Sequence, residues 1–329
     1  MILAAAILFF AFVLDLLLGD PPFRFHPVRL IGFSIEIVEK LLLKLGLSGL
    51  VGGGFLLIGV SGLFAGAYLG LRLFLSGLHP WLATIFDLYL VYSCLALTDL
   101  LKHATPVAES LDKGDLGQAR ITLQKIVGRD TSKLDSAGVA RGGVESAAEN
   151  FIDGILSPLF WYSAGAILGL ILRCRAPAAA GVSAILIFKV VSTLDSMVGY
   201  RRGHYLLFGR PAARFDDLAN FIPARLSLII LFGGALVSGE SAKAGWEIAG
   251  RDRLKHLSPN AGHSESFVAG TLGIRLGGPT AYQDRTVEKP WLGNGNAEAG
   301  PDHIRRCCRL IYRSSWLAVL FFTAILLNL

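Results

Sequence analysis

Long apolar runs, separated by shorter polar stretches, dominate the pattern along the chain. A helix needs roughly 20 predominantly apolar residues to cross the hydrocarbon core of a bilayer. Several runs approach that length, and they cover residues 3–18, 54–75, 81–96, 155–172, 176–191 and 316–329. The pattern therefore predicts about five to seven spans in an all-α, polytopic integral membrane helical bundle.

Polar stretches connect these runs and occupy residues 19–44, 102–153, 199–220 and 240–313. We expect a single integral membrane domain, residues 1–329, whose connections are helical and glycine-rich loops. In the second stretch, apolar residues recur at three- and four-residue spacing up to Gly128, which predicts a helical hairpin between spans. Basic residues crowd all four stretches, so the positive-inside rule predicts that these loops are cytoplasmic in a multi-pass cell-membrane protein.

Two segments need separate treatment. The first run is expected to be a retained helix, since it lacks the basic region of a signal peptide and Asp20, Pro21 and Pro22 follow it closely. The segment 226–237 has only 12 uncharged residues, which is short for a span. We expect it not to cross, or to cross only with distortion.

Composition agrees with a membrane protein. Charged residues make up 17% of the chain, against about 25% in ordinary soluble proteins. The net charge of +6 fits basic cytoplasmic loops, and the sequence contains no nucleic-acid-binding motif. The four cysteines have neither the spacing of a zinc site nor that of a disulfide framework.

Three carboxylates share a helical spacing in the stretch VESAAENFIDGILSPLFWY. Glu145, Glu149 and Asp153 fall at i, i+4 and i+8, so a helix places them along one face at the mouth of an apolar segment. Like charges at that spacing repel. We therefore expect a divalent metal, basic side chains or an amine substrate against them, because ionisable groups beside a membrane helix are usually functional.

A second acidic group lies in TLDSMVGYRRGHYLLFGRPAARFDDLANFIPAR. Asp195 ends an apolar run, and Asp216, Asp217 and Asn220 fall within about one helical turn. Such oxygens can hold Mg²⁺ while the metal binds phosphates. Arginines surround the group, a mixture that suits polyphosphate or multi-carboxylate ligands. They are Arg201, Arg202, Arg210, Arg214 and Arg225.

Two further polar stretches contain candidate binding residues. Near the start, DLLLGDPPFRFHPVRLIG places His26 and Arg29 after a proline-terminated helix. Later, the glycine-rich SPNAGHSESFVAGTLGIRLGG, residues 258–278, is too polar for a span and is expected to be a loop that allows close backbone approach. It carries neither a P-loop nor a dinucleotide fingerprint.

Taken together, the stretches resemble the CbiB/CobD membrane proteins of cobalamin biosynthesis, the adenosylcobinamide-phosphate synthases. The resemblance covers nearly the whole chain. It rests on LGDPPFRFHPVRLIG, VGRDTSKLD, VESAAENFIDGILSPLFWY, TLDSMVGYR, FGRPAARFDDLANFIPARL, SPNAGHSES and GIRLGGP. Two positions depart from the family pattern, since Ser192 stands where we expect Asn and His263 where we expect an aromatic residue.

The resemblance implies an amide ligase that joins (R)-1-amino-2-propanol or its O-phosphate to a propionate of adenosylcobyric acid, with ATP and Mg²⁺. Other membrane enzymes of late cobalamin synthesis are candidate partners, and the lipid bilayer is its medium. The glycine loop would close over the nucleotide or the corrin ring.

The resemblance also suggests roles for individual residues. The catalytic candidates are Glu145, Glu149, Asp153, Asp195 and Glu265. The candidates for binding the nucleotide are Arg201, Arg214, Asn220, Arg225, Ser258, Asn260, Gly277 and Gly278. The metal ligands would be Glu149, Asp216 and Asp217, and the substrate-binding residues would be Asp20, His26, Arg29 and Arg275.

Two other function classes remain open from the sequence. One is a membrane-embedded, Mg²⁺-dependent transferase of another substrate, although such enzymes usually carry two Asp-rich motifs and this chain has one Asp-Asp pair. The other is a non-catalytic sensor, since the family is similar to AmpE-type membrane proteins and fold alone does not secure activity.

Overall fold

The protein is almost entirely helical. The structure is a computed structural model that describes the whole chain except residues 21–22, 200–202, 283–284 and 296–297, together with the side chains of 280–287. Among the described residues, six helical runs are long and apolar enough to cross a membrane, within the predicted number. They are Gly49–Leu78, Pro80–Asp112, Ser136–Ile171, Pro177–Val198, Tyr205–Ser238 and Pro301–Leu327. The predicted all-α polytopic membrane architecture is therefore confirmed.

The chain divides into two compact units, each built from separate stretches of sequence. The first contains residues 1–96, 157–220 and 319–329, and the second contains residues 97–156 and 221–318. The expectation of a single domain over 1–329 stays a prediction.

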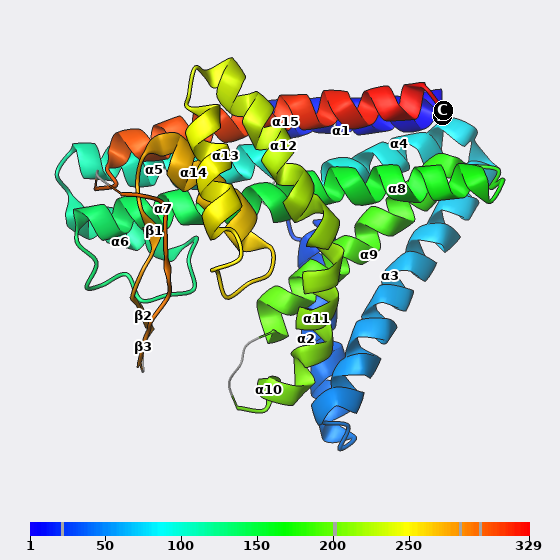
Figure 1. Cartoon of the computed structure of the whole chain (residues 1–329). Coiled ribbons are helices and arrows are strands. Elements are labelled where there is room, and N and C mark those ends of the chain that lie inside the picture. The colour runs from blue at the N-terminus through cyan, green and yellow to red at the C-terminus, as the bar shows by residue number, and fades with distance from the viewer. Residues whose placement is uncertain (21–22, 200–202, 283–284, 296–297) are drawn as a thin grey trace. The chain divides into compact units, whose positions relative to one another are not determined.

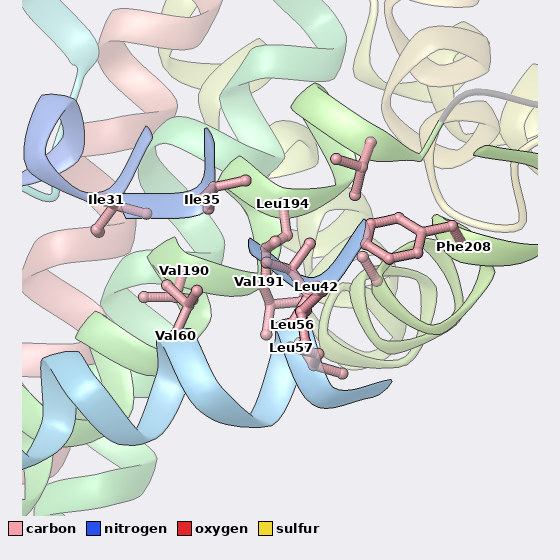
Figure 2. Close-up of a cluster of buried hydrophobic side chains, with 12 residues drawn as sticks. Ile31, Ile35, Leu42, Leu56, Leu57, Val60, Val190, Val191, Leu194 and Phe208 are labelled. Atoms are coloured by element: carbon pink, nitrogen blue, oxygen red, sulfur yellow. The ribbon is translucent and has the colours of Figure 1, made fainter. Parts of the chain in front are cut away.

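The first unit is a helical assembly around a continuous apolar core. Its helices are α1 (Ile2–Leu18), α2 (Pro27–Lys44), α3 (Gly49–Leu78), α4 (Pro80–Tyr92), α8 (Ser157–Ile171), α9 (Pro177–Val198), α10 (Tyr205–Phe208) and α11 (Arg210–Ala219), with the end of α15 (Pro301–Leu327). Helices α2, α3, α9, α10 and α11 pack together (Figure 1). Ile35, Leu56, Val190, Leu194 and Phe208 interdigitate in that core (Figure 2).

Local signals explain where several helices begin and end. Proline occupies the first turn of α2, α4 and α9, where its missing N–H costs no hydrogen bond. Helix α1 stops at Gly19, whose φ of 65° is readily adopted only by glycine. The predicted first helix, residues 3–18, is thus confirmed to within one residue.

The second unit combines helices with two small antiparallel sheets. Its elements are α5 (Leu97–Asp112), α6 (Leu116–Gln124), α7 (Ser136–Phe151), η1 (Ile152–Leu156), α12 (Phe221–Ser238), α13 (Ala242–Asp252), α14 (Ala261–Leu272), β1 (Leu276–Gly277), β2 (Thr280–Tyr282), β3 (Arg285–Val287), β4 (Trp291–Leu292) and the first part of α15. Strand β1 pairs with β4, and β2 with β3. The hairpin expected in 102–153 is present as α5 and α6, which pack together, although α6 ends at Gln124 rather than at Gly128.

Three expectations need correction. The segment 226–237 belongs to an 18-residue helix, α12, inside a run that is long enough to cross, so our length argument against crossing is wrong. Residues 261–272 of the expected glycine loop form α14, in which every residue is buried. Asp153 lies in the π-helical turn η1, whose wider turn interrupts the regular spacing expected from Glu145 to Asp153.

Candidate functional site

Glu145 is the centre of an ion-paired group in the second unit. It projects from α7, which begins after Asp135, whose carboxylate caps the helix by accepting from the Gly138 N–H. Glu145 Oε2 accepts from Arg129 Nη2 at 2.6 Å, and Oε1 accepts from the Gly277 N–H at 2.7 Å. The cation expected beside this carboxylate is therefore Arg129, and Glu145 also holds the start of the β1–β4 connection.

Glu265 brings a second carboxylate toward the first. It lies on α14, which packs against α7, and only 4% of its surface is exposed. Burial raises the pKa of Glu265 well above its ordinary value, and the charges of Glu145 and Glu149 raise it further, while Lys289 and Arg129 oppose them. The raised pKa gives Glu265 a greater affinity for a proton than a carboxylate in water has, and binding a proton there would relieve the repulsion among the three carboxyl groups.

His256 adds a titratable ring to this group. Its Nε2 lies 3.9 Å from Glu265 Oε1, and its Nδ1 accepts from the Ser258 N–H at 3.0 Å. Burial lowers the pKa of His256, and Lys289 lowers it further. The acceptor role of Nδ1 places the imidazole proton on Nε2 in the neutral ring, the atom that faces the Glu265 carboxyl. We call Arg129, Glu145, Glu149, His256 and Glu265 the carboxylate cluster.

Glycines explain how a polar helix such as α14 becomes buried. A Cβ on Gly262 would meet the Arg253 carbonyl at 2.4 Å, and one on Gly270 would meet the Ala244 carbonyl at 2.5 Å. These glycines allow the chain to pack closely against α13 and the turn that follows it. The polar residues of α14 are thus internal to the unit and helical, whereas composition predicted a loop.

Gly277 and Gly278 have a similar role in the β1–β4 connection. Both have positive φ, 79° and 78°. A Cβ at Gly277 would lie 2.4 Å from the Pro290 carbonyl, and a Cβ at Gly278 would lie 2.4 Å from the Trp291 ring. The space that these glycines leave is filled by the chain itself, whereas we expected it to accommodate a ligand.

In the first unit, Asn220 links two helices. Its Nδ2 donates to Asp216 Oδ2 at 3.1 Å, and its Oδ1 accepts from Ser157 Oγ at 2.5 Å. Asp217 acts electrostatically on Asp195, so α9 and α11 do bring these carboxylates near each other. This acidic group matches the one expected from sequence, with Asn220 serving as a tether between α11 and α8.

The amino-terminal candidates also meet. His26 is buried, and its Nε2 lies 2.9 Å from Asp20 Oδ1. Burial lowers the pKa of His26, Asp20 raises it, and Arg29 lowers it again. The pair joins the end of α1 to the start of α2, and the Arg29 side chain is exposed.

The remaining candidates are more scattered. Arg214 is exposed, and the Arg225 guanidinium stacks on the Phe221 ring at 3.3 Å. Asn260 is buried at the start of α14. Ser258 Oγ accepts from the backbone N–H groups of Asn260 and Ala261. Arg201 lies outside the described residues. Within the described part of the chain, no group of three or more His, Cys, Asp or Glu side chains is arranged to hold a metal ion.

Asp252 and Asp87 are two of the buried acids that were not predicted from the sequence. Asp252 accepts from Arg251, Lys255 and the Gly293 N–H; burial opposes its ionisation, but these bonds hold its pKa far below the ordinary value. Asp87 in α4 accepts from Tyr68 Oη at 2.7 Å and from Arg72 Nε at 2.9 Å. The sequence could have pointed to Asp87, because an acidic residue inside an apolar run requires a partner for its charge.

Fold and site together define an all-α polytopic membrane protein with carboxylate-rich polar groups buried among its helices. Residues 8–311 match the family described as CobD/Cbib protein. The chain is 40% identical over 318 residues to cobalamin biosynthesis protein CobD of Klebsiella pneumoniae, covering 96% of this chain and 95% of the relative.

Other relatives agree. Cobalamin biosynthesis protein CbiB of Salmonella paratyphi B is 40% identical, covering 95% of both chains. CobD of Desulfotalea psychrophila is also 40% identical, covering 95% of this chain and 94% of the relative. No solved structure matches the chain. The protein belongs to the CobD/CbiB family, and its role lies in cobalamin biosynthesis.

Proposed function

We propose that this protein is an ATP-dependent amide ligase that joins (R)-1-amino-2-propanol or its O-phosphate to a propionate of adenosylcobyric acid. Family membership supports the pathway. The observation that carries the chemistry is the buried Glu265 carboxyl, which lies among the charges of Glu145, Glu149 and Arg129. Amide formation releases protons from the amine nitrogen, and a carboxylate with a raised pKa suits the role of their acceptor.

The reaction needs activation because an amine deprotonates a carboxylic acid at neutral pH, and oxide is a poor leaving group. A propionate oxygen attacks the γ-phosphorus of ATP and ADP leaves, which gives an acyl phosphate. The amine nitrogen then attacks the carbonyl carbon, and inorganic phosphate leaves as the amide forms. At neutral pH the amine is an ammonium ion, so its nitrogen loses two protons. The first goes to a base and frees the nucleophile, and the second leaves as the amide forms and goes to the departing phosphate.

Glu265 is our candidate for that base. General bases work best when their pKa lies near the operating pH, and burial beside two carboxylates raises the pKa of Glu265 in that direction. His256, 3.9 Å away, is in a position to pass the proton on. Arg129 keeps Glu145 paired, so the cluster does not carry three uncompensated charges.

The acidic group of the first unit suits Mg²⁺. Magnesium bound with a nucleotide needs only one or two protein carboxylates, because phosphates and water supply the other oxygens. Asp216 and Asp217 provide that donor chemistry, with Asn220 orienting Asp216. The ion would neutralise the triphosphate charge. Glu149, which belongs to the second unit, remains a further candidate ligand.

The decisive experiment supplies detergent-purified protein with adenosylcobyric acid, Mg²⁺-ATP and either aminopropanol or its phosphate, and detects the product by mass. Glu265→Gln is expected to lose at least about 100-fold in kcat, the lower range for a general base. Because glutamine has almost the same size and shape as glutamate and needs no charge compensation when buried, this substitution should leave the fold intact. Glu149→Gln and Asp217→Asn are expected to lose activity too.

Glu247→Gln is the matched control, since this exposed residue on α13 pairs with Lys243 at the surface. It should retain full activity. An active Glu265→Gln protein would remove Glu265 as the base. Absence of product from native, corrinoid-binding wild-type protein would refute the ligase proposal.

Because ATP is cytoplasmic, we also propose that the four polar stretches face the cytoplasm of a cell-membrane protein, where other membrane enzymes of late cobalamin synthesis are candidate partners. Although α12 is long enough to cross, this arrangement requires that it does not carry residues 240–313 to the outer face, so a Ser238→Cys variant should resist a membrane-impermeant thiol reagent added outside. Labelling from outside would mean that α12 crosses fully.

A further inference from the structure

Two arginines share one tryptophan ring beside the carboxylate cluster. The Cζ atoms of Arg141 and Arg275 each lie 5.0 Å from the centroid of the Trp291 ring. Arg141 comes from α7, Arg275 from the residue before β1, and Trp291 from β4. Trp291 is 38% exposed, so ligands in solution have access to part of this group. We call these three residues the arginine–tryptophan group.

The surrounding backbone holds this group in place. Strand pairing sets Gly277 opposite Trp291, and the absent side chain of Gly278 leaves room for the indole ring. Gly295, at a φ of 47°, leaves room for the stem of Arg275, whose Cγ would lie within contact distance of any Cβ there. Two glycines with positive φ therefore shape the loop to fit Trp291 and Arg275.

The group is also tied to the carboxylate cluster. Arg141 precedes Glu145 by one helical turn of α7, so both side chains lie on the same face of that helix. Glu145 accepts from the Gly277 N–H, the residue that pairs with Trp291. Glu145 accepts from Arg129 and Gly277, and within the described part of the chain Arg141 makes no ion pair with a carboxylate, so its charge can serve another anion.

Electrostatics favours an anion at this place. Both guanidiniums lie 5.0 Å from one centroid, so their carbons are at most twice that distance apart. Two positive charges this close repel, and the ring offsets the repulsion only in part. Guanidinium groups present planar forks that match phosphate oxygens, and charge-assisted bonds of this kind are strong.

We propose that Arg141, Arg275 and Trp291 form a binding site for a phosphoryl group. This inference rests on the proposed function for its choice of ligand, since ATP and aminopropanol O-phosphate both carry phosphoryl groups. Bound here, the phosphoryl group lies next to the cluster that contains the candidate base. The site thus positions one phosphorylated reactant relative to Glu265.

The test measures binding rather than turnover, using the full-length protein in detergent. Mg²⁺-ATP, aminopropanol O-phosphate and free aminopropanol are titrated separately by calorimetry. The variants are Arg141→Gln, Arg275→Gln and the charge-preserving Arg275→Lys, with the exposed Arg309→Gln of α15 as a matched control. Thermal unfolding of every variant identifies any that are misfolded.

Each glutamine variant should weaken binding of one phosphorylated ligand by about 10- to 100-fold, the usual loss for a charged hydrogen bond. Arg275→Lys should lose less, and Arg309→Gln should bind like the wild type. Loss for Mg²⁺-ATP alone assigns the site to the nucleotide, and loss for the amine phosphate alone assigns it to that substrate. Unchanged binding of both, or an equal loss for free aminopropanol, overturns the proposal.

Tryptophan fluorescence gives a second readout that needs no arginine variant. Wild-type emission should change saturably with the phosphorylated ligand, and Trp291→Phe should abolish that change. A signal that persists in Trp291→Phe contradicts the site. If binding behaves as expected in protein that makes no amide product, the phosphoryl site stands and the ligase proposal fails, so the two are separable.

Discussion

Gly278→Ala is expected to destabilise the protein by roughly 2–5 kcal/mol, from two separate causes. The φ of 78° is strained for any residue with a Cβ, at a cost of about 1–2 kcal/mol. The new methyl would also lie 2.4 Å from the Trp291 ring, and overpacking of this kind adds about 1–3 kcal/mol. Trp291 cannot move freely, since strand pairing and two arginines hold it.

Two other glycines separate these causes. Gly273 has a φ of 69°, and a Cβ added there would meet no other group within 4 Å, so Gly273→Ala should lose only the backbone contribution. Gly250 is helical, exposed and equally open, so Gly250→Ala should stabilise by about 0.5–1 kcal/mol. Equilibrium unfolding by sodium dodecyl sulfate in mixed micelles measures all three variants.

The order of stability should be Gly250→Ala, wild type, Gly273→Ala and then Gly278→Ala. Equal losses for Gly273→Ala and Gly278→Ala would refute the packing argument, because only Gly278 meets the ring. Trp291 emission should change in Gly278→Ala and not in Gly273→Ala. If Gly278→Ala changes the affinity for the phosphorylated ligand and the other two variants do not, the position of Trp291 affects binding at the proposed site.

Three further predictions concern buried acids. Asp87→Asn should lower the free energy of unfolding in micelles by about 3–5 kcal/mol, because it leaves the Arg72 charge without its anion. The control Glu36→Gln, at an exposed position, should lower it by less than about 0.5 kcal/mol. Equal losses for the two variants would contradict the buried ion pair. Because the pKa of Asp252 is depressed in the folded protein, its ionised carboxylate stabilises the fold above about pH 4. This contribution to the free energy of unfolding should be lost as pH falls through the folded pKa. An Asp252→Asn protein that unfolds in acid at the same pH as the wild type would disprove this. If Glu265 is the base, kcat/KM should rise with pH through its raised pKa, and a flat profile would argue against that role.

The acidic spacing shows how far local pattern reaches. The i, i+4 relation of Glu145 and Glu149 is realised because α7 is regular, and the Asp216, Asp217 and Asn220 turn is present in α11 and its cap. The same rule failed at Asp153, where a π-helical turn intervenes. Spacing along the sequence is interpreted with the period of a regular α-helix, about 3.6 residues per turn, and that period does not reveal where a wider π-helical turn occurs.

Composition misjudged α14 for a different reason. Its residues Ser264, Glu265 and Ser266 are polar, so the stretch was expected to be a loop, yet each lies buried in a helix. The small residues Gly262 and Gly270 permit close contact with neighbouring backbone, and neighbours supply the burial. Burial of a polar helix depends on partners distant in sequence, which a local window does not contain.

The sequence by itself determined the membrane-helical class, the approximate helix positions and the residues that resemble the family, because apolar run length and helical spacing are local properties. Only the tertiary structure decided that Arg129 and Gly277 share Glu145, that Glu265 lies buried beside it, and that Arg141 and Arg275 meet at Trp291. Those contacts join residues up to 150 positions apart along the chain. Packing of helices and loops sets such distances, and no periodicity of the chain encodes them.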